Sequence, residues 1–502
     1  MVQGTASGAG KSFLVTAFCR LFARAGYRVA PFKSQNMALN AAVAADGGEI
    51  GRAQATQAEA AGVAPTVDMN PILLKPEGDL RSQVVIRGSA TRSVDVAAYH
   101  RMAPELLTIV GESLARLRAA HDLVVIEGAG SPAEINLAAT EIVNMRIARL
   151  AGAPVLLVGD IDRGGVFASL VGTLALLDAD DRARIAGFLI NRFRGERRLL
   201  EPGLEMLTAR TGVPVLGVVP FIHERLVPAE DSLDIEHMAS TADGAVVDIA
   251  VIRLPHIANF DDFEPLADEP GVRVRFVRGA GELGRADLVI VPGTKTTVAD
   301  LGWLHERGLG AAIRAAASAG RPVLGICGGF QMLGTRVEDP EGLDGVAGSA
   351  TGLGLLPVTT RFAGAKRTVR VRARVAAARG PFAAAAGREI GAYEIHVGGT
   401  SSAGDPAFTV VARGADLSRD ADGAVSADGA VTGTYLHGIF ADDALRGALL
   451  GALAVRAGRT PDSRWGRPRR AGERYDRLAD HVAAAVDLAA VAKLVGLSWP
   501  RA

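Results

Sequence analysis

Short runs of Val, Ile and Leu alternate with longer Ala-rich stretches along most of this chain. Apolar runs of this length, bounded by Gly, Pro or charged residues, are typical of strands that are buried on both faces. When such strands alternate with helices, they pack as a parallel sheet covered by helices, so the pattern predicts an α/β fold. The runs are residues 123–126, 154–158, 185–190, 213–219, 248–253, 274–277, 287–291 and 323–326.

The length of 502 residues exceeds what one hydrophobic core supports, so we expect two or three domains. The alternation weakens between Pro228 and Val247, where acidic, small and turn residues mix. We therefore predict a first domain at 1–235, a linker at 236–247, a second αβ domain at 248–460 and a C-terminal helical tail at 461–502. We expect an amphipathic helix near 478–495 in this tail, and a mixed-sheet edge in the strand-rich sequence that follows Phe362.

Charge and cysteine content narrow the class of protein. The 55 basic and 55 acidic residues balance, so no global field draws nucleic acid or an anionic membrane. The two cysteines, Cys19 and Cys327, lie far apart, which indicates neither a disulfide framework nor a thiolate metal cluster. The apolar stretches are short and no signal peptide is evident, so we expect a soluble, cytoplasmic protein with no nucleic-acid or membrane partner. The sequence does not indicate an oligomeric state.

The chain opens with a phosphate loop, GTASGAGKS, from Gly4 to Ser12. The backbone of such a loop, here including Gly8 and Gly10, turns its N–H groups toward phosphates. Lys11 would reach the terminal phosphates of a nucleotide, and the Ser12 hydroxyl would join a magnesium shell. Five residues separate the first glycine from Gly10, where the common motif has four. An amphipathic helix follows the loop, as a phosphate-binding site requires.

Polar residues that end other strands are candidates for the same site, because ligands of open α/β sheets bind at the carboxyl ends of the strands. Glu127 is the leading magnesium ligand. Asp160 and Asp162 share this edge, where a plain turn role is equally compatible with their positions. Lys33 could neutralise a transferred phosphate, and Asn191 could read a base edge.

The second half contains GICGGFQ, residues 325–331, directly after a strand-like run. This layout predicts a nucleophile elbow, in which a sharp strand-to-helix turn projects Cys327 into solvent. Gly325 and Gly329 would relieve the crowding that such a turn imposes. The motif therefore indicates a thiol nucleophile.

A thiol that attacks an amide needs a base within hydrogen-bond reach. His437 in TYLHGIF and His396 in YEIHVGG both lie in strand-like sequence, and we favour His437. Backbone amides of Gly293, in VPGTKT, and of Gly328 could form the oxyanion hole. A nucleotide site in one half and a thiol in the other suggest two coupled half-reactions.

Many separate blocks together resemble the cobyric acid synthase family, the glutamine-dependent amidotransferases of cobalamin biosynthesis. In the first half these blocks are VQGTASGAGKS, FKSQNMALN, MNPILLKPEGD, EGAGSPAEINL, GDIDRGGVFASL and INRFRGE. In the second half they are LPHIANFDDFEPL, VPGTKTT, GICGGFQMLG, YEIHVG and YLHGIF. The resemblance covers nearly the whole chain. It implies a P-loop domain of the dethiobiotin synthetase-like branch, in which the longer loop spacing is normal, and a class I glutamine amidotransferase-like domain.

The resemblance also implies roles. Cys327 would be the nucleophile and His437 its base, whereas Gly438 and Ile439 stand where ordinary class I members carry Pro-Glu. A dyad or a different orienting acid is then implied, with Glu394 as one candidate. The expected reaction is amidation of the b, d, e and g carboxylates of adenosylcobyrinic acid a,c-diamide, a corrinoid, with L-glutamine as nitrogen donor and ATP and Mg²⁺ for activation.

Three alternatives remain at this point. Cobyrinic acid a,c-diamide synthase shares the two-domain logic but acts on two other carboxylates, and the NMALN and GDIDRGGVFA blocks favour the four-carboxylate enzyme. A P-loop regulator similar to the septum-positioning ATPases would leave the thiol half unexplained. The third alternative is a scaffold without activity.

Overall fold

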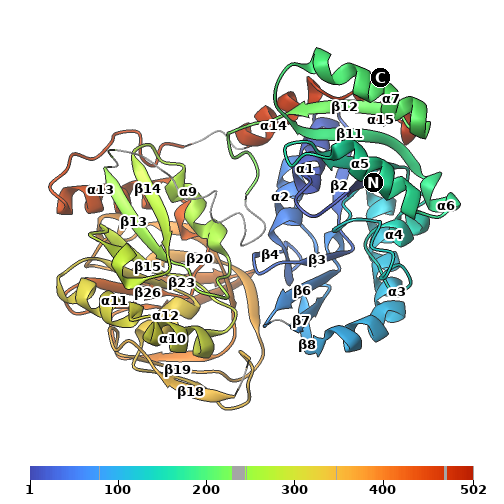
Figure 1. Ribbon diagram of the computed structural model, residues 1–502. Helices are drawn as coiled ribbons and strands as arrows, with labels where there is room; N and C mark the ends of the chain where they lie inside the picture. The colour runs from blue at the N-terminus through green and yellow to red at the C-terminus, as the bar shows by residue number, and fades with distance from the viewer. Residues whose placement is uncertain (79, 229–243, 245, 346, 469–471, 501–502) are drawn as a thin grey trace.

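The computed structural model describes residues 1–78, 80–228, 244, 246–345, 347–468 and 472–500. These residues form two α/β domains that lie side by side, the first in blue to green and the second in yellow to orange (Figure 1). The predicted linker, 236–247, lies outside the described residues except for 244, 246 and 247.

The first domain is built on a parallel sheet with the strand order β2-β9-β1-β10-β11-β12. Within it, β2 pairs with β9, and a parallel bridge between Val2 and Glu127 joins this pair to β1. The expected buried strands are therefore present, with shifts of up to three residues at their ends. The strands are β1 (Val2–Gly4), β2 (Val29–Phe32), β9 (Leu123–Ile126), β10 (Val155–Asp160), β11 (Ile185–Phe193) and β12 (Val215–Pro220). The helices are α1 (Lys11–Arg24), α3 (Val96–Ala120), α4 (Met145–Ala151), α5 (Val166–Leu176), α6 (Ala179–Arg182) and α7 (Arg197–Thr211).

A smaller layer of the first domain faces the second domain (Figure 1). Its β4–β5 hairpin and the β3-β6-β7-β8 sheet bring Ala41, Val43, Leu73 and Val85 into one apolar cluster with Ile395 of the second domain. The contact between the two domains therefore contains a small cluster of buried apolar side chains. The elements are β3 (Gln35–Met37), β4 (Ala41–Val43), β5 (Glu49–Gly51), α2 (Arg52–Ala61), η1 (Val67–Met69), β6 (Ile72–Pro76), β7 (Arg81–Ile86) and β8 (Ser89–Asp95).

The second domain has a six-stranded sheet of order β14-β13-β15-β16-β26-β25, parallel except for the edge strand β25. Its strands are β13 (Val247–Ile252), β14 (Val272–Val277), β15 (Leu288–Val291), β16 (Val323–Ile326), β25 (Ala424–Val425) and β26 (Val431–Thr434). The helices around it are η3 (Phe260–Phe263), α9 (Glu264–Ala267), η4 (Ala280–Leu283), α10 (Thr297–Glu306), α11 (Leu309–Ser318), α12 (Gly328–Leu333), η6 (Ile439–Ala441) and α13 (Asp443–Arg456).

The strand-rich sequence after Phe362 forms more than the predicted sheet edge. Of its strands, β25 and β26 join the six-stranded sheet, and β20, β21, β23 and β24 build a separate antiparallel sheet. The remaining strand, β22, adds an edge to a sheet whose other strands, β17, β18 and β19, precede Phe362. The predicted mixed-sheet edge is present, because β25 pairs antiparallel with β26 at the edge of the otherwise parallel sheet. The sequence did not predict the additional antiparallel sheet, in which strands such as β20 find their partners in neighbouring hairpins. The elements are β17 (Arg336–Asp339), β18 (Gly348–Thr351), β19 (Val358–Arg361), β20 (Arg367–Val375), η5 (Ala383–Ala385), β21 (Glu389–His396), β22 (Gly399–Ser402), β23 (Phe408–Arg413) and β24 (Asp416–Asp422).

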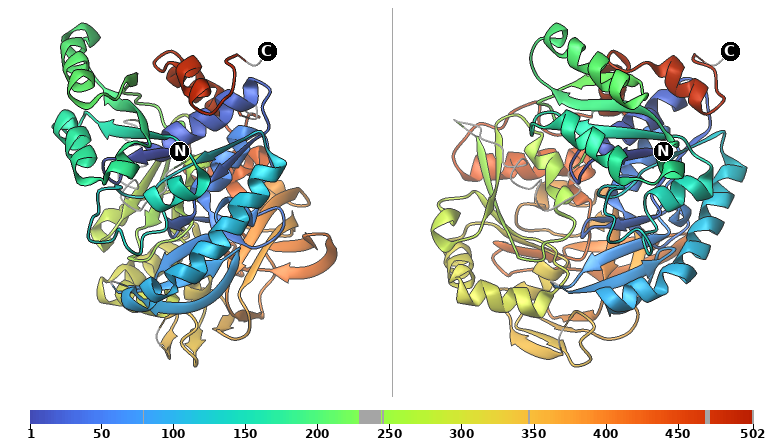
Figure 2. Two further views of the ribbon diagram at one scale, coloured as in Figure 1. Left: turned by 90° about the vertical axis from the view of Figure 1, so that its right-hand side faces the viewer. Right: turned by 45° about the vertical axis from the view of Figure 1, so that its right-hand side comes forward.

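The C-terminal tail returns to the first domain, where its red helices lie against α1 (Figure 2). Two helices, α14 (Glu473–Ala483) and α15 (Leu488–Leu494), replace the single helix expected near 478–495. The chain breaks between them because Val486 pairs with Gly217 of β12 and Asp487 caps α15. Arg20 of α1 forms a salt bridge of 2.8 Å with Asp476 of α14, which fixes the tail on the nucleotide half.

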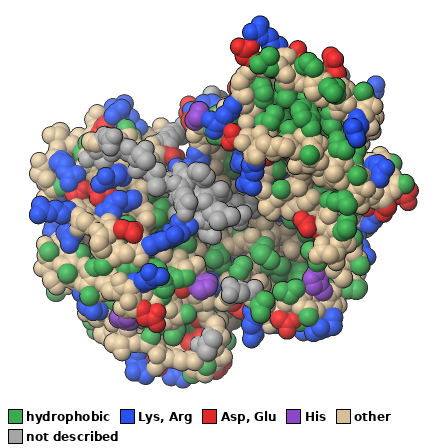
Figure 3. All heavy atoms as spheres, viewed as in Figure 1, with side chains coloured by type: hydrophobic (Ala, Val, Ile, Leu, Met, Phe, Trp, Pro, Cys, Tyr) green, Lys and Arg blue, Asp and Glu red, His purple; other side chains and the backbone are tan. Residues whose placement is uncertain are grey.

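Basic and acidic side chains are interspersed over the face seen in Figure 3, in keeping with their equal numbers. None of the helices in the described ranges has the length and apolar character needed to cross a membrane. Among those same residues, no three His, Cys, Asp or Glu side chains gather into a group that could hold a metal ion.

Candidate functional site

Cys327 lies at the turn between β16 and α12, as the elbow motif predicts. Its backbone has φ 52° and ψ −111°, a conformation that costs energy for any residue with a Cβ atom. A Cβ atom added to Gly329 would lie 1.9 Å from the carbonyl oxygen of Val291, so only glycine fits in the turn. We expected the Cys327 side chain to project into solvent, and it does not. Cys327 is 8% exposed and faces a cavity, because strands of both domains surround the turn.

His437 lies beside the thiol and is held by a buried carboxylate. The imidazole Nδ1 donates to Asp262 Oδ2 at 2.6 Å, and the backbone N–H of Gly438 donates to Asp262 Oδ1 at 2.8 Å. A hydrogen bond also links His437 to Cys327. Because Asp262 accepts at Nδ1, the hydrogen bond with Cys327 involves the other ring nitrogen, Nε2, which also lies 3.4 Å from Asn259 Nδ2. Cys327, His437 and Asp262 therefore have the relative arrangement of a nucleophile, a base and an orienting acid.

The electrostatics of this trio favour the imidazolium. Burial opposes a charged ring, but the Asp262 carboxylate and the hydrogen bond to Cys327 outweigh it and raise the pKa of His437 to about 10. An imidazolium next to a sulfur atom stabilises a thiolate and can later protonate a leaving amine.

The structure separates the two histidines that the sequence offered. His396 lines the same cavity, but its ring stacks on Tyr435 at 3.9 Å between ring centroids, and no carboxylate within the described residues forms a hydrogen bond with it. Burial lowers the pKa of His396 to about 4, so it is neutral at physiological pH. Glu394, the orienting acid suggested by the sequence, binds Arg413 at 3.0 Å instead. That suggestion was wrong because Glu394 points from β21 toward β23, away from the thiol.

Both glycines predicted for an oxyanion hole lie next to the thiol. A Cβ atom added to Gly293 would lie 3.1 Å from the His437 ring and 3.6 Å from the Cys327 Cβ atom. Gly328 begins α12, and its added Cβ atom would lie 3.1 Å from the backbone nitrogen of Thr294. Backbone of two loops thus converges beside the sulfur, as stabilisation of a tetrahedral oxyanion requires.

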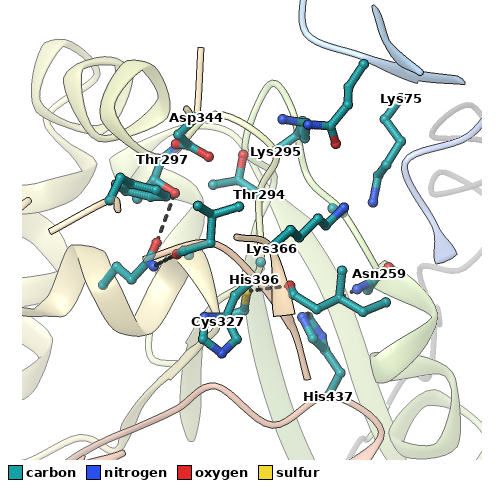
Figure 4. A pocket seen from close by; sticks show the side chains of 18 residues that line it. Lys75, Asn259, Thr294, Lys295, Thr297, Cys327, Asp344, Lys366, His396 and His437 are labelled. Atoms are coloured by element: carbon teal, nitrogen blue, oxygen red, sulfur yellow. Dashed lines mark hydrogen bonds between the residues drawn. The ribbon is translucent and has the colours of Figure 1, made fainter. Parts of the chain in front are cut away.

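The cavity beside the thiol has a volume of about 50 Å³ and is lined by both domains. Lys75 and Gln83 come from the first domain, on β6 and β7. In Figure 4, Asp344 and Thr297 lie on one side of Cys327, and Lys75 lies on the other. A small, polar molecule with charges at one end fits such a lining.

In the first domain, the phosphate-loop residues and Glu127 converge at the carboxyl edge of the sheet. Ser12 Oγ donates to Glu127 Oε1 at 2.8 Å, and Lys33 Nζ lies 2.9 Å from the same oxygen. Gln57 Nε2 donates to the other carboxylate oxygen, Oε2, at 2.5 Å. A hydroxyl and a carboxylate oxygen this close provide the hard oxygen donors that Mg²⁺ prefers.

Hydrogen bonds from two side chains hold the phosphate loop in place. Lys11 Nζ donates to the carbonyl oxygens of Ala6 and Gly130, each at 3.0 Å. Asn191 Nδ2 donates to Ala9 O at 3.1 Å, so Asn191 contacts the backbone of the phosphate loop. A Cβ atom added to Gly10 would lie 2.0 Å from Asn191 Nδ2, which makes glycine necessary at this position.

The other predicted residues at the carboxyl edge of this sheet, Gly8, Asp160 and Asp162, lie next to arginine side chains. Gly8 has a φ of 73° and faces the Arg163 guanidinium, which would lie 3.2 Å from an added Cβ atom. Asp160 forms an ion pair of 2.8 Å with Arg192, and Asp162 one of 2.9 Å with Arg194. Both aspartates are therefore engaged by arginines in this structure.

The second cysteine is distant from this chemistry. Cys19 is buried in α1, and burial, together with the charge of Glu127, raises the pKa of its thiol far above the usual range. A thiol in such surroundings is inert.

Two protein-family models match the chain. The CobQ/CobB/MinD/ParA nucleotide binding domain covers residues 1–231, and the CobB/CobQ-like glutamine amidotransferase domain covers residues 248–445. The cobyric acid synthase of Sorangium cellulosum is 56% identical over 99% of this chain and 98% of that protein. Those of Dehalococcoides mccartyi and Pelotomaculum thermopropionicum are each 50% identical, over 97% and 100% of this chain and over 96% and 97% of those proteins.

The chain belongs to the cobyric acid synthase family. It is a glutamine-dependent amidotransferase with a nucleotide-binding domain and a class I glutamine amidotransferase-like domain, so the predicted fold class and enzyme class are confirmed. Membership of this family sets aside the alternatives of a nucleotide-switched regulator and of a scaffold without activity.

Sequence reasoning missed two residues of the cobyric acid synthase site. Asp262 follows the first strand of the second domain and lies in the block LPHIANFDDFEPL, which was noted only as a family signature. Its position after a parallel strand was the available signal. Gln57 lies inside an Ala-rich helix, and nothing in the sequence indicates its contact with Glu127.

Proposed function

We propose that this enzyme converts adenosylcobyrinic acid a,c-diamide to adenosylcobyric acid. It amidates the b, d, e and g side-chain carboxylates with nitrogen from L-glutamine and activation by ATP. One observation carries the proposal: a thiol with an oriented imidazole and a phosphate loop with a buried carboxylate occur in one chain. The names of the relatives support the corrinoid as acceptor.

In the glutaminase half, Cys327 acts as the nucleophile and His437 as its base, with Asp262 orienting the imidazole. The Cys327 sulfur attacks the side-chain amide carbon of glutamine, and the oxyanion is held by the backbone amides of Gly293 and Gly328. His437 then protonates the leaving nitrogen, so that ammonia departs and a glutamyl thioester remains. Water hydrolyses the thioester to glutamate and restores the thiol.

In the nucleotide half, the backbone at Gly8 and Gly10 and the Lys11 ammonium bind the phosphates of ATP. Ser12 and Glu127, whose oxygens lie 2.8 Å apart, would hold Mg²⁺, which prefers hard oxygen ligands. The cation would neutralise phosphate charge when bound. Lys33, beside Glu127, is placed to meet the transferred phosphate, and Asn191 to contact the base from the loop.

The two halves meet in an acyl phosphate. A carboxylate repels nucleophiles and lacks a good leaving group, so the substrate carboxylate oxygen takes the γ-phosphoryl group and ADP leaves. Ammonia then attacks the acyl carbon, and inorganic phosphate departs with the C–O bond electrons. Ammonium in water is not nucleophilic, so the ammonia travels by a sheltered path.

Residues 1–235 thus form the amidoligase domain, 236–247 a linker, 248–460 the glutaminase domain and 461–502 a tail. The free thiol of Cys327 suits the reducing cytoplasm, where we place the enzyme.

The test is incubation of the enzyme with ATP, glutamine and the diamide corrinoid, with amides counted by mass spectrometry. Four amides support the proposal, whereas two amides formed on a diacid precursor would assign cobyrinic acid a,c-diamide synthase instead. Cys327→Ser is the matched control, since it should lose amidation from glutamine and keep amidation from ammonium chloride. Glutamine cleavage without any nucleotide consumption in the presence of a corrinoid acid would refute the proposal.

A further inference from the structure

An arginine of the nucleotide-binding domain reaches into the glutaminase site. Arg52 is the first residue of α2, and its side chain is 17% exposed. The Nε atom lies 2.7 Å from Asp261 Oδ2, and an Nη atom donates to the Tyr393 hydroxyl at 2.9 Å. Both partners belong to the second domain, so this guanidinium crosses the domain interface and is nearly covered by it.

One partner of Arg52 directly precedes the acid that orients the catalytic imidazole, and the other stacks on that imidazole. Asp261 directly precedes Asp262, which accepts the hydrogen bond from His437. The Tyr393 ring stacks on the His437 ring, with centroids 5.3 Å apart and planes at 18°. The backbones of Tyr393 and His437 also exchange two hydrogen bonds, of 2.9 and 3.1 Å. The position of the imidazole therefore depends on both groups that Arg52 binds.

We infer that Arg52 is a positioning residue for the glutaminase reaction, supplied by the nucleotide-binding domain. It fixes the loop that carries Asp262 on one side of His437 and the stacked Tyr393 ring on the other. Asp261 needs this cation because burial raises the pKa of its carboxyl group, and the charge of Arg52 opposes that shift. Without Arg52, the buried Asp261 side chain would lose its cation and the loop would relax toward solvent.

The same helix also contacts the nucleotide site. Gln57 lies five residues after Arg52 in α2, about 7.5 Å along the axis of an α-helix, and it donates to Glu127. One short helix therefore links the carboxylate assigned to magnesium with the histidine assigned to glutamine cleavage. Since the inference gives Arg52 a role in that cleavage, it rests on the proposed function.

The test measures glutamine hydrolysis by the full-length Arg52→Ala and Arg52→Lys variants. A displaced imidazole should lower kcat roughly 10- to 100-fold in Arg52→Ala, since errors of about 1 Å in a catalytic group have this effect. KM for glutamine should change less than about threefold, because Arg52 does not line the cavity beside Cys327. Arg52→Lys keeps a charge near Asp261 and should recover part of kcat.

Arg370→Ala is the matched control. Arg370 of the second domain also crosses the interface, donating from Nε to Val43 O at 3.0 Å. Its backbone pairs with Tyr393 on the neighbouring strand β21, a pairing that alanine keeps, and within the described residues its side chain donates no hydrogen bond to His437, Asp261 or Asp262. This variant should keep kcat within about twofold of the parent. Equal losses in Arg370→Ala and Arg52→Ala, or an unchanged kcat in Arg52→Ala, would overturn the inference.

Two further measurements keep the outcomes distinct. Thermal unfolding and amidation from ammonium chloride show whether Arg52→Ala is folded. If it is not folded, the kcat and KM of Arg52→Lys for glutamine test the role of Arg52 instead. A parent enzyme that fails to hydrolyse glutamine would refute the proposed function itself. A parent enzyme that hydrolyses glutamine while both Arg52 variants match it would refute only the role of Arg52.

Discussion

Replacement of Asp262 by asparagine tests the orienting acid. Asp262 accepts two hydrogen bonds on two different oxygens, from His437 Nδ1 and from the Gly438 N–H. Asparagine has the same shape but only one acceptor oxygen, so one of the two donors must face an NH₂ group. Without the carboxylate the ring is no longer held as an imidazolium. A neutral ring that carries its one proton on the nitrogen facing Cys327 can neither accept the thiol proton nor stabilise a thiolate.

The structure sets the magnitude of this effect. The pKa of His437 is raised from 6.5 to about 10, a preference for the imidazolium of roughly 5 kcal/mol that Asp262 shares with Cys327. Loss of half of this preference, about 2.5 kcal/mol, corresponds to a kcat that is lower by roughly 70-fold. The equivalent change in a serine protease triad costs about 10⁴-fold. We therefore expect Asp262→Asn to lower kcat for glutamine hydrolysis by roughly 10²- to 10⁴-fold.

The assay is glutamate release at pH 7.5, together with the rate at which iodoacetamide alkylates Cys327. Both rates should fall in Asp262→Asn, since the imidazolium no longer stabilises the thiolate. Glu394→Gln is the control, because it removes the other acid that the sequence suggested, which binds Arg413. Glu394→Gln should keep kcat within about threefold. A variant Asp262→Asn that retains a fifth or more of the parent kcat would refute the reasoning, above all if Glu394→Gln is the one that loses activity.

Three further predictions address the nucleotide site, the elbow and the interface. Lys11→Met should lower ATP-dependent amidation more than about 100-fold and leave glutamine hydrolysis within threefold; equal losses in both assays would contradict separate sites. Gly329→Ala should abolish glutamine hydrolysis or prevent folding, because its Cβ atom would lie 1.9 Å from a carbonyl oxygen, whereas Gly302→Ala in α10 has open space and should match the parent. Burial disfavours the charge of Glu49, but Lys366 and Lys75 lower its pKa to about 2, from 4.5 for a free side chain. The stabilisation from these ion pairs is therefore present above pH 4.5 and is lost as the pH falls toward 2. Over this pH range, the unfolding free energy of Glu49→Gln should fall by roughly 3 kcal/mol less than that of the parent. Denaturant titrations between pH 2 and 7 measure this pH dependence, and the same dependence in the variant would contradict a stabilising role of the ion pairs.

The sequence predicted the parallel sheets well because buried strands and the turns that end them are local signals. Residues 123–126 and 323–326 form strands with the expected limits. The β3-β6-β7-β8 layer was missed, since its strands are short and only partly apolar. The sheets built after Phe362 depend on which hairpins pair with each other, and a local pattern does not contain that choice.

Residue type and local spacing alone determined that this chain carries a phosphate loop and a thiol at a strand-to-helix turn, because a few adjacent residues create each of these devices. Tertiary structure alone decided which acid orients His437, since Asp262 and His437 are 175 positions apart and meet only when β13 and β26 lie in one sheet. It also decided that Arg52 supports that histidine from another domain. Long-range contacts of this kind follow from how the sheets pack against each other, and each requires partners that no sequence window contains.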